Sequence, residues 1–336
     1  MPRDPLLTAG PGRHHPFLML CIRRSLAGIA ATCAVSLLVF VGTDLLPGDA
    51  ADVILTRSAS SGGGTPEQLA ALRAELGLDV PWPQRYLGWI GGLLQGDLGS
   101  SLVSGRSVTD VIGSRLGNTL VLAGTATVLL VPVAVGLGLW SGIRQGRPGD
   151  RVVSGVAVAA QALPEFVAAT LLIAVFALIA GLLPAVSLVP PGTSPLARPE
   201  ILVLPVLSLL SVMAGQSIRM VRARTSEVVR ADFVRVARLH GIPERRVVWR
   251  YVVPNALGPA LQLLAGSISW LVGGIVVVEQ VFAYPGISHE LVQAIISRDV
   301  PVVQALAFAM AVCTLAIYTL ADLLVVALVP KLRTGG

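Results

Sequence analysis

Lysine and histidine are scarce in this chain, and their scarcity excludes two kinds of chemistry. The 336 residues contain a single lysine, Lys331, six residues from the end. A Walker-type loop needs a lysine that reaches the nucleotide phosphates, so we expect no ATP hydrolysis by such a site. The four histidines form no HExxH motif and no carboxylate–histidine cluster at metal-ligand spacing. They are His14, His15, His240 and His289. GxSxG is also missing, so we predict no catalytic residue and no metal site.

Cysteine and charge are low as well. Cys21, Cys33 and Cys313 lie in or beside apolar runs, show no CxxC or zinc spacing, and are typical of small buried hydrophobic residues. Only 13% of residues are charged, against about a quarter in soluble domains. Together with 54% hydrophobic residues and a mean hydropathy of +0.77, this composition indicates a membrane protein.

Apolar segments of about twenty residues or more are candidate transmembrane helices. The six candidates are 25–46, 116–140, 152–183, 200–217, 256–283 and 302–329. The third is longer than one span and contains Pro164, so we expect tilt, a kink or a projecting end. The fourth contains Pro205 and is the weakest candidate. The pattern predicts an all-α, polytopic protein with about six transmembrane helices.

Basic residues gather on one side of this arrangement. They precede the first apolar segment, separate the second from the third, and follow the sixth, and nine arginines lie between Arg219 and Arg250. On the other side, segment 47–115 has five arginines against seven acids. The positive-inside rule therefore places both termini in the cytoplasm. It also explains the net charge of +6 without a nucleic-acid partner.

The first apolar run ends without a small-residue cleavage site, so we interpret it as a retained anchor rather than a signal peptide. In the outer segment, residues 66–78 predict a short helix. Trp82, Tyr86 and Trp89 follow at about helical spacing, which is more typical of a membrane-interface belt than of a ligand cage.

The segment "RVARLHGIPERRVVWRYVVPNAL", residues 235–257, is too basic to lie in a bilayer. Strong helix formers fill residues 227–240, Gly241 supplies a C-terminal stop, and Pro243 suits the first turn of a following helix. We expect a helix, a sharp turn and a second helix that ends at Pro254. Such a knob can dock a partner through its apolar residues, while its arginines meet water and anionic lipid headgroups. An ordinary basic loop is the simpler alternative.

This segment resembles the cytoplasmic signature of the permease subunits of binding-protein-dependent ABC importers. That signature has an EAA-type box, a glycine four residues after the second alanine, nine residues of spacer, and then I-x-L-P. Here "RVARLHG" begins at Arg235, Ala237 stands at the second alanine, and Gly241 stands at the glycine. Residues 242–250 form the spacer before the stretch that ends at Pro254. Arg235 and the residue after it depart from the glutamate and alanine of the general box.

The variant R-x-A-R-x-x-G is similar to that of the dipeptide, oligopeptide and nickel branch. Stretches such as "LGLDVPWPQRYLGWIGGLLQGDLGSSL" and "EQVFAYPGISHELVQAIISRDVPVVQA" are similar to segments of its first permease. The resemblance runs from about Cys21 to Arg333. Glu165 is a departure, since a small neutral residue is expected after the proline of the third span.

The resemblance implies a type I ABC importer permease fold in the plasma (inner) membrane. In this family the knob is a coupling helix inserted in a groove of the ATP-binding subunit. On that basis Ala237, Gly241 and Pro254 are expected to shape the knob, and Phe233, Arg235 and Arg238 to make contacts. The implied partners are a second homologous permease, two ATP-binding subunits that hold ATP and Mg, an extracytoplasmic solute-binding protein and membrane lipid. The resemblance implies no cofactor in this chain.

Polar residues inside apolar segments are costly and usually face a bundle interior or a wet path. Glu165 is a candidate contact for a peptide amino group or another cation, although a hydrogen bond to a neighbouring helix or a neutral carboxyl explains it too. Gln161 and Gln216 are candidates for the pathway, with interhelical hydrogen bonding as the alternative. Two further acids, Glu279 and Asp322, are interpreted as packing or helix-end partners.

These interpretations divide the chain into five parts. They are a cytoplasmic tail (1–20), a first transmembrane helix (21–46), an extracytoplasmic segment (47–115), a transmembrane core (116–329) with a cytoplasmic coupling loop (218–255), and a cytoplasmic C-terminus (330–336). The predicted function is the permease subunit of an ATP-driven importer for peptides or similar small solutes, with the exact solute left open. Two alternatives remain: a secondary carrier or channel, which needs its own coupling-ion or selectivity site, and a membrane scaffold that docks a partner other than an ATPase.

Overall fold

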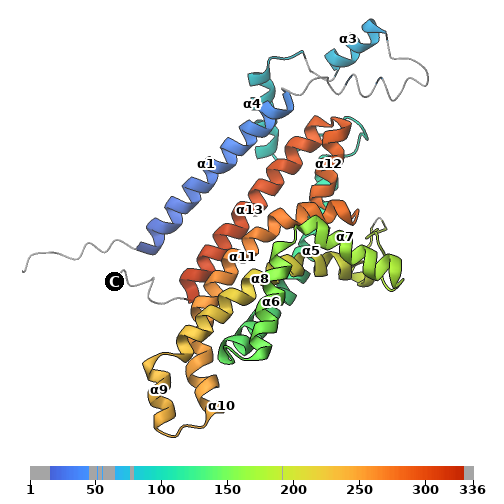
Figure 1. Cartoon of the computed structure of the whole chain (residues 1–336). Helices are drawn as coiled ribbons and strands as arrows, with labels where there is room; N and C mark the ends of the chain where they lie inside the picture. The colour runs from blue at the N-terminus through green and yellow to red at the C-terminus, as the bar shows by residue number, and fades with distance from the viewer. Residues whose placement is uncertain are drawn as a thin grey trace, which may run out of the picture.

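Helices make up the described part of the chain (Figure 1). The computed structural model describes residues 16–44, 51, 55, 65–75, 79–190 and 192–328. Within these ranges every named element is a helix, and an isolated antiparallel bridge joins Ser100 to Ser107. The all-α prediction is confirmed for these residues.

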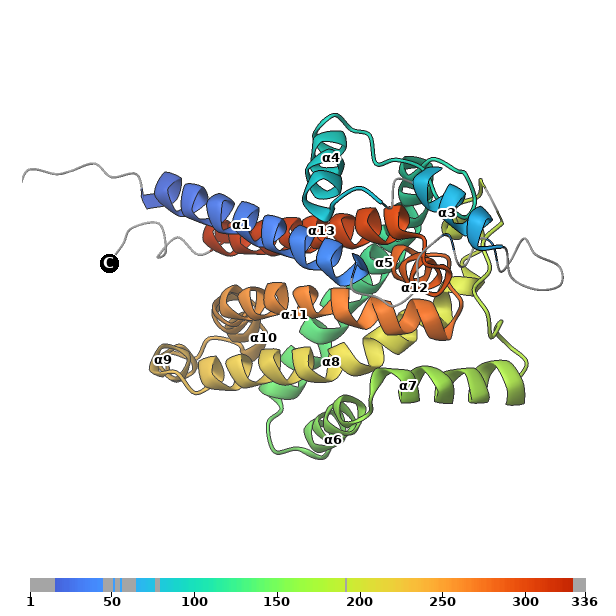
Figure 2. The same ribbon diagram turned by 90° about the horizontal axis from the view of Figure 1, so that it is seen from above.

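Long helices form a bundle and shorter ones connect them. The long helices are α1 (Pro16–Asp44), α5 (Val108–Ile143), α8 (Glu200–Val229), α11 (Val253–Val281) and α13 (Val300–Leu328). The shorter elements include α3 (Pro66–Glu75), α4 (Trp82–Leu94), α6 (Pro148–Ala162), α7 (Glu165–Leu172), the π-type helix η1 (Ile173–Ile179), the 3₁₀ turn η2 (Pro195–Ala197) and α12 (Ile287–Ser297). Figures 1 and 2 show α1 beside α13, and α8 packed among α5, α6 and α11.

Four of these helices are long and apolar enough to cross a membrane. Their spanning stretches are Leu26–Thr43, Val108–Ile143, Glu200–Val229 and Val300–Ile317. The bent pair of α6 with α7 and η1 meets the same criterion as a fifth. These coincide with five of the six predicted segments. The other, 256–283, coincides with α11, although the side chains of residues 259–272 lie outside the described part.

The third predicted segment is sharply bent. α6 meets the helix that follows it at an angle of 106°. Leu163 is extended at the break (φ −82°, ψ 130°), and Pro164 occupies the N-cap position of α7. The helical conformation is disfavoured for a residue before proline, and proline lacks the N–H that a continuing helix needs. The predicted kink is confirmed, and it leaves Glu165 as the first residue of a new helix.

The central helix α8 packs closely on its neighbours through small residues. Apolar side chains from α5, α8 and α11 form the largest buried cluster, which includes Leu122, Leu130, Leu204, Leu209, Ile275 and Phe282. α5 approaches α8 at Gly138 and Gly142, where an added side chain would collide with Val221 or Thr225. Lipid tails are as apolar as the side chains of a spanning helix, so the hydrophobic effect does not drive two such helices together. Close van der Waals packing between small residues drives their association instead.

The sequence predicts one helix over residues 227–240. That prediction is wrong, because the structure has two helices there with a break between them. α8 ends at Val229, and α9 (Asp232–Leu239) begins after Ala231. Ala231 is extended (φ −66°, ψ 145°) and serves as the N-cap of α9. The strong helix formers at these positions do not prevent the break, because packing decides where a surface helix stops.

The second helix does not end at Pro254, which corrects another prediction. α10 (Glu244–Val247) continues through the π-type helix η3 (Val248–Val252) into α11, and Pro254 lies in the first turn of α11. The Val253 N–H donates to the Val248 carbonyl, five residues back. A π-type turn widens the helix where the ring of Pro254 would otherwise clash with a preceding carbonyl. The proline is therefore accommodated without a break.

Candidate functional site

The helices α9 and α10 form a small knob at one end of the bundle (Figure 1). They lie next to one another in both views and are joined by a short turn (Figure 2). Because α9 follows α8 almost directly and α10 continues into α11, the knob is attached to the two helices at the centre of the bundle. A force on the knob would therefore reach both helices.

The turn of the knob depends on Gly241, which has a positive φ of 73°. Its N–H donates to the Arg238 carbonyl at 3.0 Å, and the Ile242 N–H donates to the Ala237 carbonyl at 3.3 Å. These bonds satisfy carbonyls at the end of α9, as in the left-handed caps where glycine is preferred. A side chain at this position would meet nothing within 4 Å. The requirement for glycine is therefore conformational rather than steric.

The inner face of the knob is a small apolar core. Its buried members are Val234, Ala237, Val247 and Val252, packed against Ile143 of α5 and Val228 and Val229 of α8. Ala237, which was predicted to shape the knob, is buried in this core. A larger side chain at Ala237 would overpack it. The core joins both helices of the knob to the ends of α5 and α8.

The outer face of α9 is apolar and exposed. Phe233 is 46% exposed, Val236 49% and Leu239 78%. These positions are three residues apart, so they follow one side of the helix, and Arg235 is also exposed. Contiguous exposed apolar side chains are typical of an interaction surface. We call Phe233, Val236 and Leu239 the outer face of α9.

Arg238 is exposed, and its side chain is paired with an acid of the other helix of the knob. Its guanidinium donates two hydrogen bonds to the Glu244 carboxylate, at 3.0 Å and 2.7 Å. These bonds hold the pKa of the Glu244 carboxyl below its ordinary value and raise the pKa of Arg238. The pair therefore links α9 to α10 across the turn. Glu244 was missed by sequence reasoning, although a partner six residues on, across a glycine turn, was a usable signal.

Gln161 and Gln216 lie together, as expected for side chains of one pathway or one helix contact. Both line an open groove of about 480 Å³ between α6 and α8, with Arg219 and Arg222 among the other lining residues. Arg219 Nη1 donates to Gln161 Oε1 at 3.1 Å. The groove thus combines polar and charged side chains with apolar ones, on helices that otherwise suit lipid.

Glu165 lies apart from that groove. It is half-buried as the first residue of α7, and its carboxylate lies against Gly274 of α11. Among the described residues it has no hydrogen-bond or ion-pair partner. The structure thus brings the two glutamines together and leaves Glu165 on the other side of the bend.

An acid–arginine clamp near the knob was not predicted. Asp150 at the start of α6 is buried and accepts hydrogen bonds from Arg222 of α8 at 2.5 Å and 2.9 Å. Ser141 and the Gly146 N–H also donate to it. Arg222 had been counted only among the positive-inside residues. Since Asp150 precedes it by 72 residues, sequence spacing carried no signal for the pair.

Glu279 is a helix-end partner, which confirms its interpretation. Its buried carboxylate accepts from the Ser288 N–H at 2.8 Å, the His289 N–H at 3.1 Å and the Thr119 hydroxyl at 2.6 Å. It thereby caps α12 and ties it to α5. The side chain of Asp322 lies outside the described residues.

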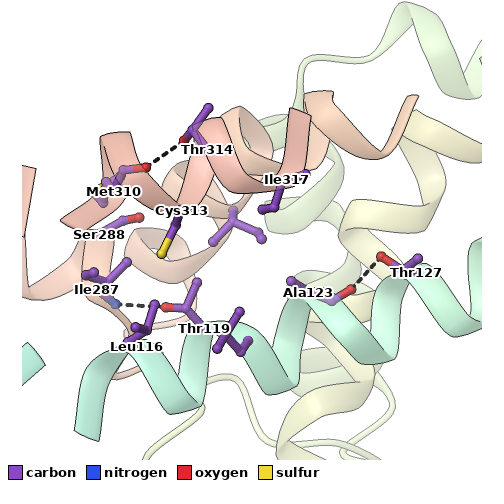
Figure 3. Close-up of a pocket in the computed structure, with 12 residues that line it drawn as sticks. Leu116, Thr119, Ala123, Thr127, Ile287, Ser288, Met310, Cys313, Thr314 and Ile317 are labelled. Atoms are coloured by element: carbon purple, nitrogen blue, oxygen red, sulfur yellow. Dashed lines mark hydrogen bonds between the residues drawn. The ribbon is translucent and has the colours of Figure 1, made fainter. Parts of the chain in front are cut away.

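A cavity next to this network is too small for a solute. Figure 3 shows Thr119 bonded to the Ile287 N–H and the Cys313 thiol near Ser288, among apolar side chains of α5, α12 and α13. Its volume is about 70 Å³, well below the roughly 300 Å³ of the smallest typical ligand pockets. We therefore assign it to helix packing.

Comparison with known proteins shows similarity to membrane components of transport systems. Residues 134–334 match the family described as "Binding-protein-dependent transport system inner membrane component". The chain is 34% identical to the glutathione transport system permease protein GsiC of Escherichia coli O6:H1, over 93% of this chain and 98% of that protein. It is 32% identical to a Brucella ovis protein with a provisional peptide permease name, over 94% and 99%. A crystal structure of an amino acid ABC transporter has a similar fold, with a TM-score of 0.50, 18% identity, and coverage of 65% of this chain and 94% of that chain.

Proposed function

Because the chain belongs to the binding-protein-dependent transport system inner membrane components, we propose that its knob, α9 with α10, couples transport to ATP hydrolysis by a separate subunit. As a member of this family it is the permease subunit of an importer, a non-catalytic component of the inner membrane. The observation that carries the proposal is the exposed outer face of α9, on a knob fixed to both central helices.

The geometry supports coupling through rigid attachment. The inner face of α9 is buried against α10 and the ends of α5 and α8, so α9 cannot tilt without moving those helices. Its outer face leaves Phe233, Val236 and Leu239 for a groove on a partner. Phe233 and Arg235 act as contacts, Ala237 and Gly241 maintain the shape, and Arg238 holds the turn through Glu244. Pro254 acts through the π-type turn that joins the knob to α11.

The complete transporter in this proposal has several other subunits. A second homologous permease completes the translocation pathway, two ATP-binding subunits bind ATP and Mg, and an extracytoplasmic solute-binding protein delivers cargo. The lack of a Walker lysine supports the assignment of ATP to other chains. The family description supports the dependence on a binding protein in general.

We also propose a topology of six spans with both termini in the cytoplasm. The bent pair of α6 and α7 with η1 counts as the third span and α11 as the fifth. The five-part division of the chain, including the loop 218–255, follows from this topology. The concentration of arginines around the knob supports a cytoplasmic location for it.

Peptides are the proposed cargo. The relatives are named for glutathione, itself a short peptide, and for peptides, and they align over nearly their whole lengths. Glu165 is the proposed contact for the cargo amino group, because it is an unpaired acid within the described residues at a bend of a spanning segment. Gln161 and Gln216 line the pathway through the groove that they share.

Leu239→Asp tests the coupling proposal, because Leu239 is the most exposed side chain of the outer face. The chain should be purified with its natural partners, and its ATP-dependent solute uptake and content of ATP-binding subunit measured. We expect association to weaken at least tenfold and uptake to be lost, because a buried charge without a partner is costly at the centre of an interface.

Leu196→Asp is the matched control, since Leu196 is also an exposed leucine, at 60%, but lies in η2 far along the chain from the knob. It should retain association and uptake. Wild-type coupling in Leu239→Asp would contradict the proposal. A chain that purifies without any ATPase would instead favour the secondary carrier or the scaffold.

A further inference from the structure

The side of α10 that faces away from α9 carries an unpaired cationic groove. Its lining residues are Pro243, Arg245, Arg246 and Trp249, and its volume is about 500 Å³. Both arginines are exposed, and Trp249 is 66% exposed. Val247, which lies between Arg246 and Trp249 in the sequence, is buried in the apolar core of the knob. The groove and the outer face of α9 therefore belong to different helices of the knob.

Charge in this groove is not neutralised by the protein. Among the described residues, neither Arg245 nor Arg246 has an ion-pair or hydrogen-bond partner, whereas Arg222, Arg224 and Arg238 are all paired. Glu244 is the only acid between residues 240 and 255. Its carboxylate is occupied by both hydrogen bonds from Arg238. The guanidinium groups of these two arginines, which line the same groove, are thus left for an external anion.

The position of the groove favours a lipid as the source of that anion. α10, η3 and α11 run without a break, so Trp249 lies four residues before Val253. The proposed fifth span begins at residue 256, so Trp249 lies about two helical turns before it. This places Trp249 near the headgroup layer of the proposed cytoplasmic leaflet. Tryptophan prefers this layer because its ring is apolar and its N–H is a donor.

We infer that the groove formed by Pro243, Arg245, Arg246 and Trp249 binds the phosphodiester headgroup of an anionic phospholipid of the cytoplasmic leaflet. The two guanidinium groups contact the phosphate, since arginine matches phosphate geometry with paired donors. Trp249 lies against the glycerol and the upper acyl chain. A bound lipid would fix α10 at the membrane surface while α9 engages its partner. The inference rests on the proposed cytoplasmic location of the knob.

The test measures lipid binding to the assembled transporter, purified in mild detergent and stripped of lipid. Phosphatidylglycerol or phosphatidylcholine is titrated in, and bound lipid is counted by native mass spectrometry. Wild type should bind phosphatidylglycerol more tightly. The variant Arg245→Gln/Arg246→Gln should lose about 25-fold in affinity, because each arginine near an anionic surface contributes about fivefold.

A matched control separates this groove from general attraction to positive charge. Arg147→Gln/Arg151→Gln removes the same charge from the N-cap and first turn of α6, where both arginines are exposed. Its affinity for phosphatidylglycerol should change by less than about twofold. An equal loss in both variants would overturn the site, as would equal binding of the two lipids.

Two further measurements distinguish a bound lipid from a soluble phosphate and from an ATP-binding subunit in the groove. Glycerol 3-phosphate at millimolar concentration should not displace the lipid, and displacement would mean that the groove binds soluble phosphates. The permease chain alone and the full complex should bind the lipid equally, and loss on assembly would mean that an ATP-binding subunit covers the groove. A complex that couples transport to ATP hydrolysis but shows no lipid preference overturns the lipid inference and leaves the coupling proposal intact. A complex that binds the lipid but does not couple transport overturns the coupling proposal and leaves the lipid inference intact.

Discussion

Glu165 combines an ionisable side chain, a helix start and a position inside a spanning segment. Its carboxylate lies against Gly274, where any larger residue of α11 would collide with it. The bend at Pro164 separates the first turn of α7 from the helix before it. A structural acid in the same place would be expected to have a hydrogen-bond donor, and none is present among the described residues.

Glu165→Gln should therefore impair uptake of cargo with a positive amino group more than uptake of an N-acetylated analogue. We expect a difference of about tenfold, as for loss of one hydrogen bond to a charged group. Competition uptake with the two peptides measures it. Glu200→Gln, at the exposed start of α8, should behave as wild type. Equal losses for both peptides would assign Glu165 a structural role.

The ion pair between Asp150 and Arg222 joins two helices, α6 and α8. It holds the start of α6 against α8 at the same end of the bundle as the knob, and Ser141 adds the end of α5. A buried carboxylate is tolerable here because it accepts two hydrogen bonds from Arg222 and others from Ser141 and the Gly146 N–H. The clamp holds these three helices together beside the small apolar cluster that Val221 of α8 forms with Val153 of α6 and Leu139 of α5.

Asp150→Asn should destabilise the protein by about 2–3 kcal/mol, because it leaves the partly buried Arg222 without its counter-charge. The midpoint of thermal unfolding in nanodiscs measures the effect. The double variant Asp150→Asn/Arg222→Gln should recover at least half of the loss. Asp110→Asn, which removes an exposed acid in the first turn of α5, is the control. A single variant as stable as wild type would show that the clamp contributes little.

For the molecule as a whole, the membrane topology depends on whether the bent pair of helices, α6 with α7 and η1, crosses the membrane. If α6 with α7 and η1 is one span, the connection after α5 and the η2 turn lie on opposite sides. If the pair is re-entrant, they lie on the same side, and the location of the knob relative to the N-terminus changes. The 106° bend by itself is compatible with both geometries. The crossing is favoured because Asp150 at the start of α6 pairs with Arg222 near the knob end of α8, whereas η2 precedes the other end of α8. The arginine distribution favours it too.

Single cysteines in a background without Cys21, Cys33 and Cys313 decide between them. Ser194→Cys should react with a membrane-impermeant maleimide in intact cells, while Arg147→Cys should react only after permeabilisation. Arg245→Cys in the knob should behave like Arg147→Cys. Labelling of Ser194→Cys and Arg147→Cys from the same side would exclude six spans.

At the candidate site, sequence reasoning succeeded where the cause is local. Gly241 was identified as a turn residue, and its positive φ agrees, because only glycine takes that conformation without cost. Ala237 was assigned to the shape of the knob and is buried in its core. Gln161 and Gln216 were named as candidates, but nothing in the sequence indicated that they share one groove with Arg219. That groove and the partner of Arg238 depend on which faces of separate helices meet.

The sequence by itself determined the class of the protein, its apolar segments, the kink at Pro164 and the place of the glycine turn. Hydropathy, proline sterics and glycine's backbone freedom act within a few residues, so they can be read along the chain. The tertiary structure alone decided that Asp150 pairs with Arg222, that Glu165 lies apart from the glutamines, and that the helix continues through Pro254. The first two outcomes depend on packing between helices distant in sequence, which no local pattern encodes. The third depends on a π-type turn that accommodates the proline ring.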